Sequence, residues 1–232
     1  MNVTLNGFGD RTAIEKTRFE LETTYGAKAA YFAADMSKPV DIDRMVDEAT
    51  NAFGKVDVLV NNAGILHVAA IESTPPEKWD AILSINLSSA FHTIRAVVPL
   101  MKERGWGRII NIASALGLVG SPNNSVYAAS KHGTIGLTRS VALETAEHGI
   151  TVNAICPGYV LTPLVEREIG VTAKARGASE HQVASEFLAQ TQPTRRFVTT
   201  GEIGRLAVFL CTEAAASITG AAIPIDGGWT AR

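Results

Sequence analysis

The chain has 232 residues, of which 46% are hydrophobic and 19% charged, and its formal net charge is -2 at pH 7. This length can bury a substantial core as one α/β domain or two small ones, and no composition break or linker divides the chain. The near balance of charge and the lack of a basic run argue against nucleic acid or an anionic membrane surface as a partner.

No signal-peptide pattern is visible, and we expect no apolar stretch long enough to span a bilayer. The two cysteines, Cys156 and Cys211, stand in apolar segments, which is typical of reduced core thiols. These observations favour a cytoplasmic protein with no membrane partner.

The first part of the chain alternates short apolar runs with helical patterns. We expect a strand at 2–6, a helix from Arg11 to Tyr25, a strand at 29–34, and a helix that begins near Pro39 and ends at Gly54. Asp35 and Met36 follow the second strand, and an acid at such a place can cap or hydrogen-bond locally.

The run 56–61 predicts a strand buried on both faces, as parallel sheets require. Asn62, Ala63 and Gly64 follow it, and small residues there allow a ligand to approach the backbone. The pattern from Thr74 to Glu77 predicts a capping box at the start of a long helix that continues to Leu100 and has Asn86 in its middle.

Candidate chemistry lies between Ser114 and Lys131. The apolar run 108–114 predicts a buried strand that ends at Ser114, and a glycine-containing loop leads to a helix that continues to about His148. Tyr127 and Lys131 are four residues apart and therefore share one face of this helix. A neighbouring ammonium lowers the pKa of a phenol from about 10, so we expect Tyr127 to act as an acid/base, although such a pair can also be a plain surface pair.

The remaining segments complete the alternation. We expect a strand at 151–156 followed by Pro157 and Gly158, a polar helical stretch at 165–192, a helix capped by Thr199 that runs to Cys211, and a last strand from Ala222. The stretch at 165–192 is either a mobile lid over the substrate or an ordinary surface insert. Strands that alternate with helices predict one domain, residues 1–232, of the α/β class with a doubly wound parallel sheet, and ligands then bind at the carboxyl ends of the strands.

A serine at a strand end, a loop, and then Tyr127-Ala-Ala-Ser-Lys131 resemble the pattern of the short-chain dehydrogenase/reductase family, as does Asn61-Asn-Ala-Gly64. The resemblance implies a Rossmann-like fold and hydride transfer between a nicotinamide cofactor and a secondary alcohol or ketone. On it, Tyr127 moves the proton, Lys131 lowers the pKa of Tyr127 and holds the ribose, and Ser114 orients the substrate oxygen. Asn86 holds a relay water at a local break in its helix.

The same resemblance implies contacts with the cofactor and the assembly of a homotetramer. The cofactor-binding candidates are Phe8, Asp35, Met36, Asn62, Ala63, Gly64, Tyr127, Lys131, Pro157, Gly158, Val160 and Thr162. No basic residue follows the first strand before Arg11, and relatives that prefer NADP usually have one there, so we expect NAD rather than NADP. No metal is expected.

Within the family, the chain is similar to bacterial 3-hydroxybutyrate dehydrogenases, for example in its ending Asp226-Gly-Gly-Trp-Thr-Ala-Arg232. The implied substrate-binding positions are Leu66, His67, Leu116, Asn124 and Tyr159. Where those enzymes hold the substrate carboxylate with Gln, His, Lys and Gln, this chain has Leu66, Leu116, Asn124 and Glu168. A small hydroxy acid is therefore expected to be a poor substrate.

The family's first strand and its Thr-Gly-x-x-x-Gly-x-Gly turn, which binds the pyrophosphate, have no match in these 232 residues, so we expect an N-terminally truncated version of the fold. Two hypotheses follow: an enzyme with an incomplete cofactor site, or a cofactor-free scaffold or binding protein. In the family's sheet order 3-2-1-4-5-6-7 the missing strand is central. If the chain starts at Met1, we expect weak or no NAD binding, and a gap closed by the first strands shifting onto the strand at 56–61 or by a strand from another subunit.

Overall fold

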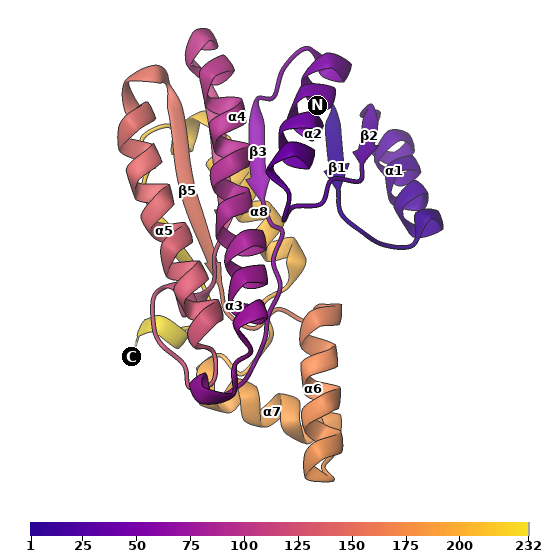
Figure 1. Cartoon of the computed structure of the whole chain (residues 1–232), viewed down its shortest axis with the longest axis vertical. Helices are drawn as coiled ribbons and strands as arrows, with labels where there is room; N and C mark the ends of the chain where they lie inside the picture. Colours follow the sequence, from indigo (N-terminus) through magenta and orange to yellow (C-terminus); the bar gives the residue numbers. More distant parts are fainter. Residues whose placement is uncertain (232) are drawn as a thin grey trace.

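The computed structural model describes residues 1–231, and strands and helices alternate along them (Figure 1). The strands are β1 Val3–Asn6, β2 Ala29–Phe32, β3 Val58–Asn61, β4 Gly107–Ile112, β5 Ile150–Pro157 and β6 Ala222–Ile225. The α-helices are α1 Arg11–Tyr25, α2 Pro39–Phe53, α3 Pro76–Leu83, α4 Ser89–Arg104, α5 Ser125–Thr145, α6 Pro163–Arg176, α7 Glu180–Thr191 and α8 Thr200–Leu210. All strand pairs are parallel, which confirms the predicted Rossmann-like class.

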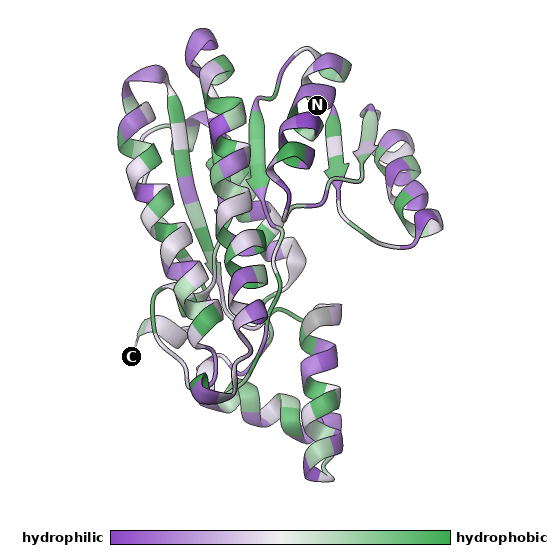
Figure 2. Cartoon of the chain, viewed as in Figure 1, coloured by the Kyte–Doolittle hydropathy of each residue, from purple (hydrophilic) through white to green (hydrophobic). Residues whose placement is uncertain are grey.

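The core lies on both faces of the sheet formed by β3, β4, β5 and β6. Helices α4 and α5 pack on one face, with α2 against α4, and α8 packs on the other (Figure 1). Successive strand residues point to opposite faces, so Ile109 joins the cluster that contains Val97 and Met101, whereas Ile110 joins the cluster around Leu210. Figure 2 shows β3 hydrophobic along most of its length, whereas α1 is largely hydrophilic.

The described residues form two sheets rather than one. The pair β1-β2 stands apart from the sheet of order β3-β4-β5-β6. The expectation that the first strands shift onto the strand at 56–61 is therefore wrong for this structure, because β1 pairs with β2 and not with β3. The consequence is a half-exposed β3, in which Val60 is 48% exposed. A strand contributed by another subunit stays a prediction.

The long central helix departs from its predicted start. Pro75 is the N-cap residue of α3 and no side chain caps it, and the hydroxyl of Thr74 donates instead to the carbonyl of Ala70 at 3.0 Å. The predicted capping box is thus wrong, because the two prolines move the helix start beyond Thr74. A π-helical turn, Ser84–Ser88, joins α3 to α4, and it confirms the predicted local break at Asn86.

The combined helical segment Pro76–Arg104 is long and apolar enough to cross a membrane by length and composition alone. This corrects the expectation that no such stretch exists. The segment packs against α2, α5, β3 and β4, and 39% of its most apolar window is buried. These contacts are those of a core helix in an α/β protein.

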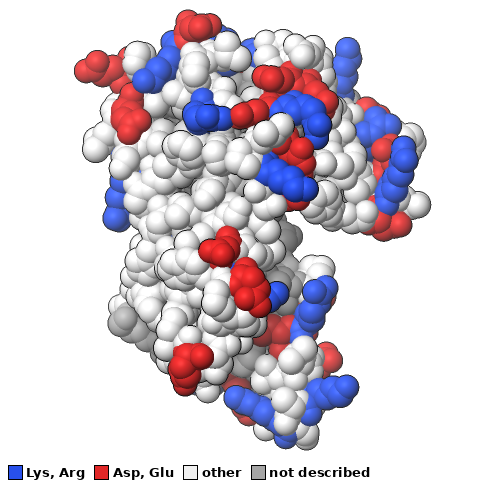
Figure 3. Space-filling view, in the orientation of Figure 1, with Lys and Arg blue, Asp and Glu red and all other residues white. Residues whose placement is uncertain are grey.

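The predicted helical stretch at 165–192 is two helices, α6 and α7, which lie at the lower end of the molecule in Figure 1. Gly177 ends α6 in the left-handed conformation, with φ of 62°, which side chains rarely adopt. The capping box of Thr199 and Glu202 at the start of α8 is confirmed. On the face seen in Figure 3, acidic and basic side chains are interspersed, and neither sign forms a continuous patch.

Candidate active site

The segment after β4 positions Ser114 against α5. A 3-10 turn, Ala115–Gly117, follows the serine, and the Ser114 hydroxyl accepts a hydrogen bond from the amide of Leu116 at 3.1 Å. A Cβ on Gly117 would lie 2.9 Å from Ile135 Cδ1 and 3.0 Å from the carbonyl oxygen of Lys131. Glycine at this position therefore allows the turn to contact the helix directly, which brings Ser114 beside Tyr127.

Burial is the main influence on the ionisation of Tyr127. It raises the pKa of the phenol above 10.0, the nearby Ser114 hydroxyl lowers it, and the negative charge of Glu168 raises it further. The expectation that Lys131 lowers the pKa of Tyr127 is wrong for this structure. Desolvation exceeds the stabilising contacts, as is common when a charged form is removed from water.

Lys131 lies against the ring of Tyr127, and its ammonium group is directed to a backbone carbonyl. Its Nζ donates to the carbonyl of Ile112 at 2.7 Å and lies 5.6 Å from the centroid of the Tyr127 ring. The residue is 4% exposed, and burial lowers the pKa of its ammonium to about 8. Lys131 is therefore a buried, desolvated cation beside Tyr127.

Asn86 fixes the loop that follows β3. Its amide oxygen accepts from the amide of Ile65 at 2.8 Å, and its amide nitrogen donates to the carbonyl of Ile65 at 3.0 Å and to Ser130 Oγ at 3.2 Å. A Cβ on Gly64 would lie 3.5 Å from Asn86 Oδ1 and 3.7 Å from Lys131 Nζ. The glycine thus leaves open the space next to both side chains.

A buried row of polar side chains supports this edge of the sheet, and sequence reasoning missed most of it. Asn61 donates to Asn111 at 2.8 Å, Asn111 donates to Thr138 at 2.8 Å, and Thr93 donates to Asn61 at 2.7 Å. The sequence signal for this row was Asn61 and Asn111, each a polar residue within an apolar strand run. The row joins β3 and β4 to α4, which follows the π-helical turn of Asn86, and to α5, which carries Tyr127.

The candidate cofactor contacts fall at the carboxyl ends of the strands. Asn62, Ala63 and Gly64 are exposed after β3, and Phe8 is 74% exposed after β1. Pro157 ends β5, and Gly158 donates its amide hydrogen to Ile225 at 3.1 Å. Val160 forms a parallel bridge with Val198, and Thr162 is the N-cap residue of α6.

The pair Asp35 and Met36 is held by local contacts. The Asp35 carboxylate accepts from the amide and hydroxyl of Ser37 and forms an ion pair with Lys38. These contacts, led by the Ser37 hydroxyl, lower the pKa of Asp35 to about 2. Met36 Sδ accepts from Asn6 Nδ2 at 2.9 Å. The Asp35 side chain therefore serves the turn before α2, which was the simpler interpretation.

The candidate substrate residues other than Tyr159 come from three segments: the loop after β3, the turn after Ser114 and the loop before α5. Leu66 and His67 are half-buried after β3, and Leu116 is buried in the turn after Ser114. Asn124 uses its amide hydrogens on Ser121 Oγ and the Pro122 carbonyl. Its side chain is thus occupied by the loop that precedes α5.

An aromatic cluster beside Tyr127 was not predicted. The ring of Tyr159 stacks with those of Phe187, at 5.6 Å between centroids, and Trp229, at 5.5 Å. Buried Gln192 accepts the amide hydrogen of Tyr159 and donates to the carbonyl of Arg196. Burial raises the pKa of Tyr159 to about 12. Nothing in the local sequence singles out Phe187 or Gln192.

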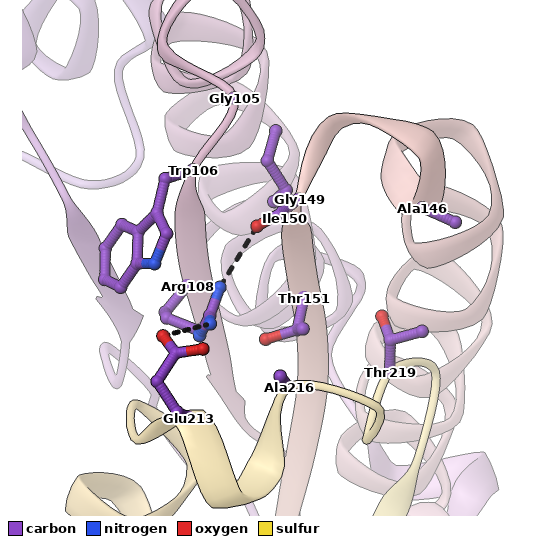
Figure 4. Close-up of a pocket in the computed structure, with 10 residues that line it drawn as sticks. All are labelled: Gly105, Trp106, Arg108, Ala146, Gly149, Ile150, Thr151, Glu213, Ala216 and Thr219. Carbon is purple, nitrogen blue, oxygen red and sulfur yellow. Dashed lines mark hydrogen bonds and ion pairs between the residues drawn. The ribbon is translucent and has the colours of Figure 1, made fainter.

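A cavity of about 220 Å³ lies at the opposite ends of the strands (Figure 4). Arg108 in its wall is 3% exposed, stacks over Trp106 at 4.5 Å, donates to the carbonyls of Gly107 and Gly149, and pairs with Glu213 at 3.7 Å. Since Gly107 and Ile150 begin β4 and β5, this cavity lies at the amino ends of the strands, away from Ser114. Its position separates it from the catalytic cluster.

Comparisons with known proteins agree with this geometry. A model of the family described as enoyl-(acyl carrier protein) reductase matches residues 1–230. The chain is 51% identical over 231 residues to a D-beta-hydroxybutyrate dehydrogenase of Rhizobium meliloti, covering 100% of this chain and 90% of the relative. The protein of the same name from Cupriavidus necator is 51% identical over 232 residues, covering 100% and 89%.

Two solved structures show the same fold. Levodione reductase superposes with a TM-score of 0.91 at 34% identity, covering 99% of this chain and 88% of that chain. L-sorbose reductase from Gluconobacter frateurii, complexed with NADPH and L-sorbose, gives a TM-score of 0.93 at 27% identity, covering 100% and 88%. These relatives are named as enzymes and give no support to a cofactor-free scaffold. The chain belongs to the short-chain dehydrogenase/reductase family and is an oxidoreductase close to D-beta-hydroxybutyrate dehydrogenases.

Proposed function

We propose that this oxidoreductase transfers a hydride between a secondary alcohol or ketone and NAD, with Tyr127 as the acid/base. The observation that carries the proposal is the cluster of Ser114, Tyr127, Lys131 and Asn86 at the carboxyl edge of one sheet. The bound nicotinamide ring supplies the hydride acceptor in the oxidative direction. Tyr127 takes the hydroxyl proton of the alcohol as the carbon loses its hydride, so the products are a ketone, a reduced cofactor and one proton.

The neighbours of Tyr127 have separate roles in this proposal. The Ser114 hydroxyl orients the substrate oxygen, and the Lys131 ammonium holds the ribose hydroxyls. Asn86 supports the proton relay through its main chain, since its amide group is used on Ile65 and Ser130. Its main-chain carbonyl accepts a hydrogen bond from the Thr134 hydroxyl at 3.4 Å. That carbonyl lies in the π-helical turn Ser84–Ser88, where the regular hydrogen-bond pattern of the α-helix is interrupted.

The residues at this edge fit a dinucleotide that lies along the strand ends. A Cβ on Gly64 would narrow the space beside Asn86 and Lys131. With glycine at this position, that space suits the ribose next to the nicotinamide. The loop of Pro157, Gly158, Val160 and Thr162 would hold the nicotinamide. Phe8 and the exposed residues Asn62 and Ala63 would lie along the adenosine, with Asp35 and Met36 contributing mainly backbone.

The test of function is NADH formation with a panel of secondary alcohols. We expect turnover of medium-sized neutral secondary alcohols and poor turnover of 3-hydroxybutyrate, because Leu66 and Leu116 offer a carboxylate no hydrogen-bond donor. Absorbance of NADH measures the rates. Efficient oxidation of 3-hydroxybutyrate at low millimolar concentration would overturn the substrate assignment and direct attention to His67, Arg195 or Arg196.

Cofactor choice is a separate prediction. We expect NADH to bind more tightly than NADPH, because the segment after β1 has no basic residue before Arg11. The acidic residue of this segment, Asp10, caps α1 by accepting a hydrogen bond from the amide of Ala13. Nicotinamide fluorescence in a direct titration measures both dissociation constants. Tighter binding of NADPH would contradict the assignment and implicate Arg11, for which Arg11→Ala is the following variant. No binding of either would favour the scaffold hypothesis.

We also propose a single domain in which 165–192 is the substrate lid, and a cytoplasmic homotetramer. Exposed apolar side chains on both faces of the molecule support assembly, since single exposed residues are ordinary but several on one face favour an interface. They are Phe91 and Leu100 on α4, Leu143 on α5, and Val208 and Phe209 on α8. Sedimentation equilibrium measures the assembly, and a monomer at micromolar concentration would contradict it.

A further inference from the structure

The cavity at the amino ends of β4 and β5 contains a buried cation whose hydrogen-bonding capacity is only partly used (Figure 4). Arg108 is 3% exposed, and its Nη1 donates to the carbonyls of Gly107 at 2.8 Å and Gly149 at 3.1 Å. Its Nε is buried and has no hydrogen-bond partner among the residues that the structure describes. A buried donor without an acceptor is unfavourable, so a bound acceptor would stabilise this guanidinium.

The acid at the rim of the cavity leaves one edge of the guanidinium open. Glu213 Oε1 lies 3.7 Å from Arg108 Nη2, which is an ion pair but longer than a hydrogen bond, and the Glu213 side chain is 84% exposed. Nε and Nη2 lie along one edge of the planar group and donate in parallel, which matches two oxygens of a carboxylate or a phosphate. The edge that suits an oxyanion therefore has no acceptor within hydrogen-bond distance in the described part of the chain.

The strand register places a hydroxyl group beside Arg108. Arg108 of β4 is paired with Thr151 of β5, so the two side chains project from the same face of the sheet. Figure 4 shows the Thr151 hydroxyl directed from its strand towards Arg108. Thr219 lines the same cavity, and because its oxygen accepts from the amide of Val152 at 3.1 Å, its hydroxyl hydrogen can be donated to a ligand. The wall thus combines a guanidinium with two hydroxyl groups.

Trp106 and the size of the cavity restrict the ligand. The guanidinium carbon of Arg108 lies 4.5 Å from the centroid of the Trp106 ring, and this stacking fixes the plane of the guanidinium. The cavity of about 220 Å³ is smaller than the roughly 300 Å³ at which pockets for drug-sized ligands begin. It therefore suits a small anion with a few water molecules.

The charge of this cavity is set by two residues. Among the described residues that line it, Arg108 is the one base and Glu213 the one acid. Because the Glu213 carboxylate is exposed, water screens its charge, whereas the charge of buried Arg108 is screened much less. Other charged side chains of the neighbouring segments are exposed, and none of them lines the cavity: Lys55, Asp57, Glu103, Arg104, Glu147 and His148.

We propose that this cavity is a binding site for a small oxyanion, namely a phosphate or carboxylate group, at the end of the sheet opposite to Ser114. Two oxygens of the anion accept from Nε and Nη2 of Arg108, and the Thr151 hydroxyl donates to it. The Glu213 carboxylate competes for the same edge and turns to solvent when the anion binds. The site is separate from the proposed hydride transfer and does not depend on it.

Calorimetric titration of sodium phosphate into the protein without cofactor tests the proposal. We expect one site with a dissociation constant on the order of 1 mM. Sodium acetate should bind to the same site, because a carboxylate fits the same edge of the guanidinium. Sodium chloride at equal ionic strength should not bind, since a single spherical ion cannot accept from both nitrogens in parallel.

Four variants locate the binding. Arg108→Lys should weaken phosphate binding by at least about 10-fold, because lysine keeps the charge and loses the two parallel donors. Thr151→Val, which removes only the hydroxyl group, should weaken it by about threefold or more. Glu213→Gln should strengthen it by about 3- to 10-fold, because it removes the competing charge at an exposed position. Glu20→Gln, at an exposed site of α1, is the matched control and should have no effect.

The cofactor site is the competing location for phosphate, and NADH separates the two. Saturating NADH should leave the phosphate affinity unchanged, because the cavity lies at the amino ends of the strands. Loss of phosphate binding on addition of NADH would overturn the proposal, as would equal binding of chloride or an unchanged affinity in Glu213→Gln. Melting temperatures check that each variant is folded, and Glu213→Gln decides the result if Arg108→Lys does not fold. A protein that turns over no alcohol would refute the proposed function and leave this test intact.

Discussion

Replacing Tyr127 with Phe should lower kcat/KM for alcohol oxidation by about 100- to 10,000-fold, the usual range for a lost acid/base group. The phenylalanine keeps the ring that packs over Lys131 and removes only the hydroxyl group. Initial rates with NAD and the best alcohol of the panel measure the loss. Circular dichroism and the melting temperature check that the fold is kept.

Tyr25→Phe is the control, because Tyr25 is exposed at the end of α1. The pH profile gives independent support. Burial and the charge of Glu168 raise the pKa of Tyr127, so oxidation by the wild type should increase as the pH rises into the alkaline range, and Glu168→Gln should move that increase to lower pH. A Tyr127→Phe variant with near wild-type turnover at neutral pH would contradict the assignment.

Replacing Lys131 with Met should reduce activity by at least about 100-fold and at the same time raise stability at neutral pH. Burial lowers the pKa of Lys131 from 10.5 to about 8, so between these values the unfolded chain binds more protons than the folded one. Wild-type stability should therefore increase as the pH rises from about 8 towards 10.5. Methionine has no charge to bury, and its advantage should be largest below pH 8.

Melting temperatures at pH 7 and pH 10 measure this effect. A gain on the order of 1 kcal/mol corresponds to roughly 2–4 °C for a chain of this size, and the loss of the donor to the Ile112 carbonyl reduces it. Lys16→Met, at an exposed site of α1, controls for the loss of one positive charge. The assignment of Lys131 fails if its Met variant keeps full activity.

The parts of the site that depend on spacing could be predicted from the sequence. Ser114 at a strand end and Tyr127 four residues before Lys131 are fixed by strand and helix geometry, and the break at Asn86 followed from the family resemblance. The ionisation of Tyr127 could not be predicted in the same way. It depends on burial by residues distant in the sequence, including Glu168 of the lid.

The errors have identifiable physical causes. The capping box at Thr74 was wrong because Pro75 and Pro76 displace the helix start. The helical stretch at 165–192 is divided into α6 and α7 because Gly177 adopts a left-handed conformation. Phe187 and Gln192 contact Tyr159 through packing across about 30 residues of chain, for which no local pattern exists. Local patterns therefore predicted the elements that carry Ser114, Tyr127 and Lys131, and missed contacts that form where several elements meet.

The separate β1-β2 sheet implies unequal resistance to local unfolding along the chain. Helix α1 buries no residue and contacts β2, whereas every residue of β5 is buried. Backbone amides of 3–32 should therefore exchange with deuterium through small openings, and those of β4 and β5 only through global unfolding. Mild denaturant or warming would then loosen the part that carries Phe8 before it disturbs Tyr127 and Lys131. Affinity for the adenosine half of the cofactor should be lost while the catalytic residues still hold their positions.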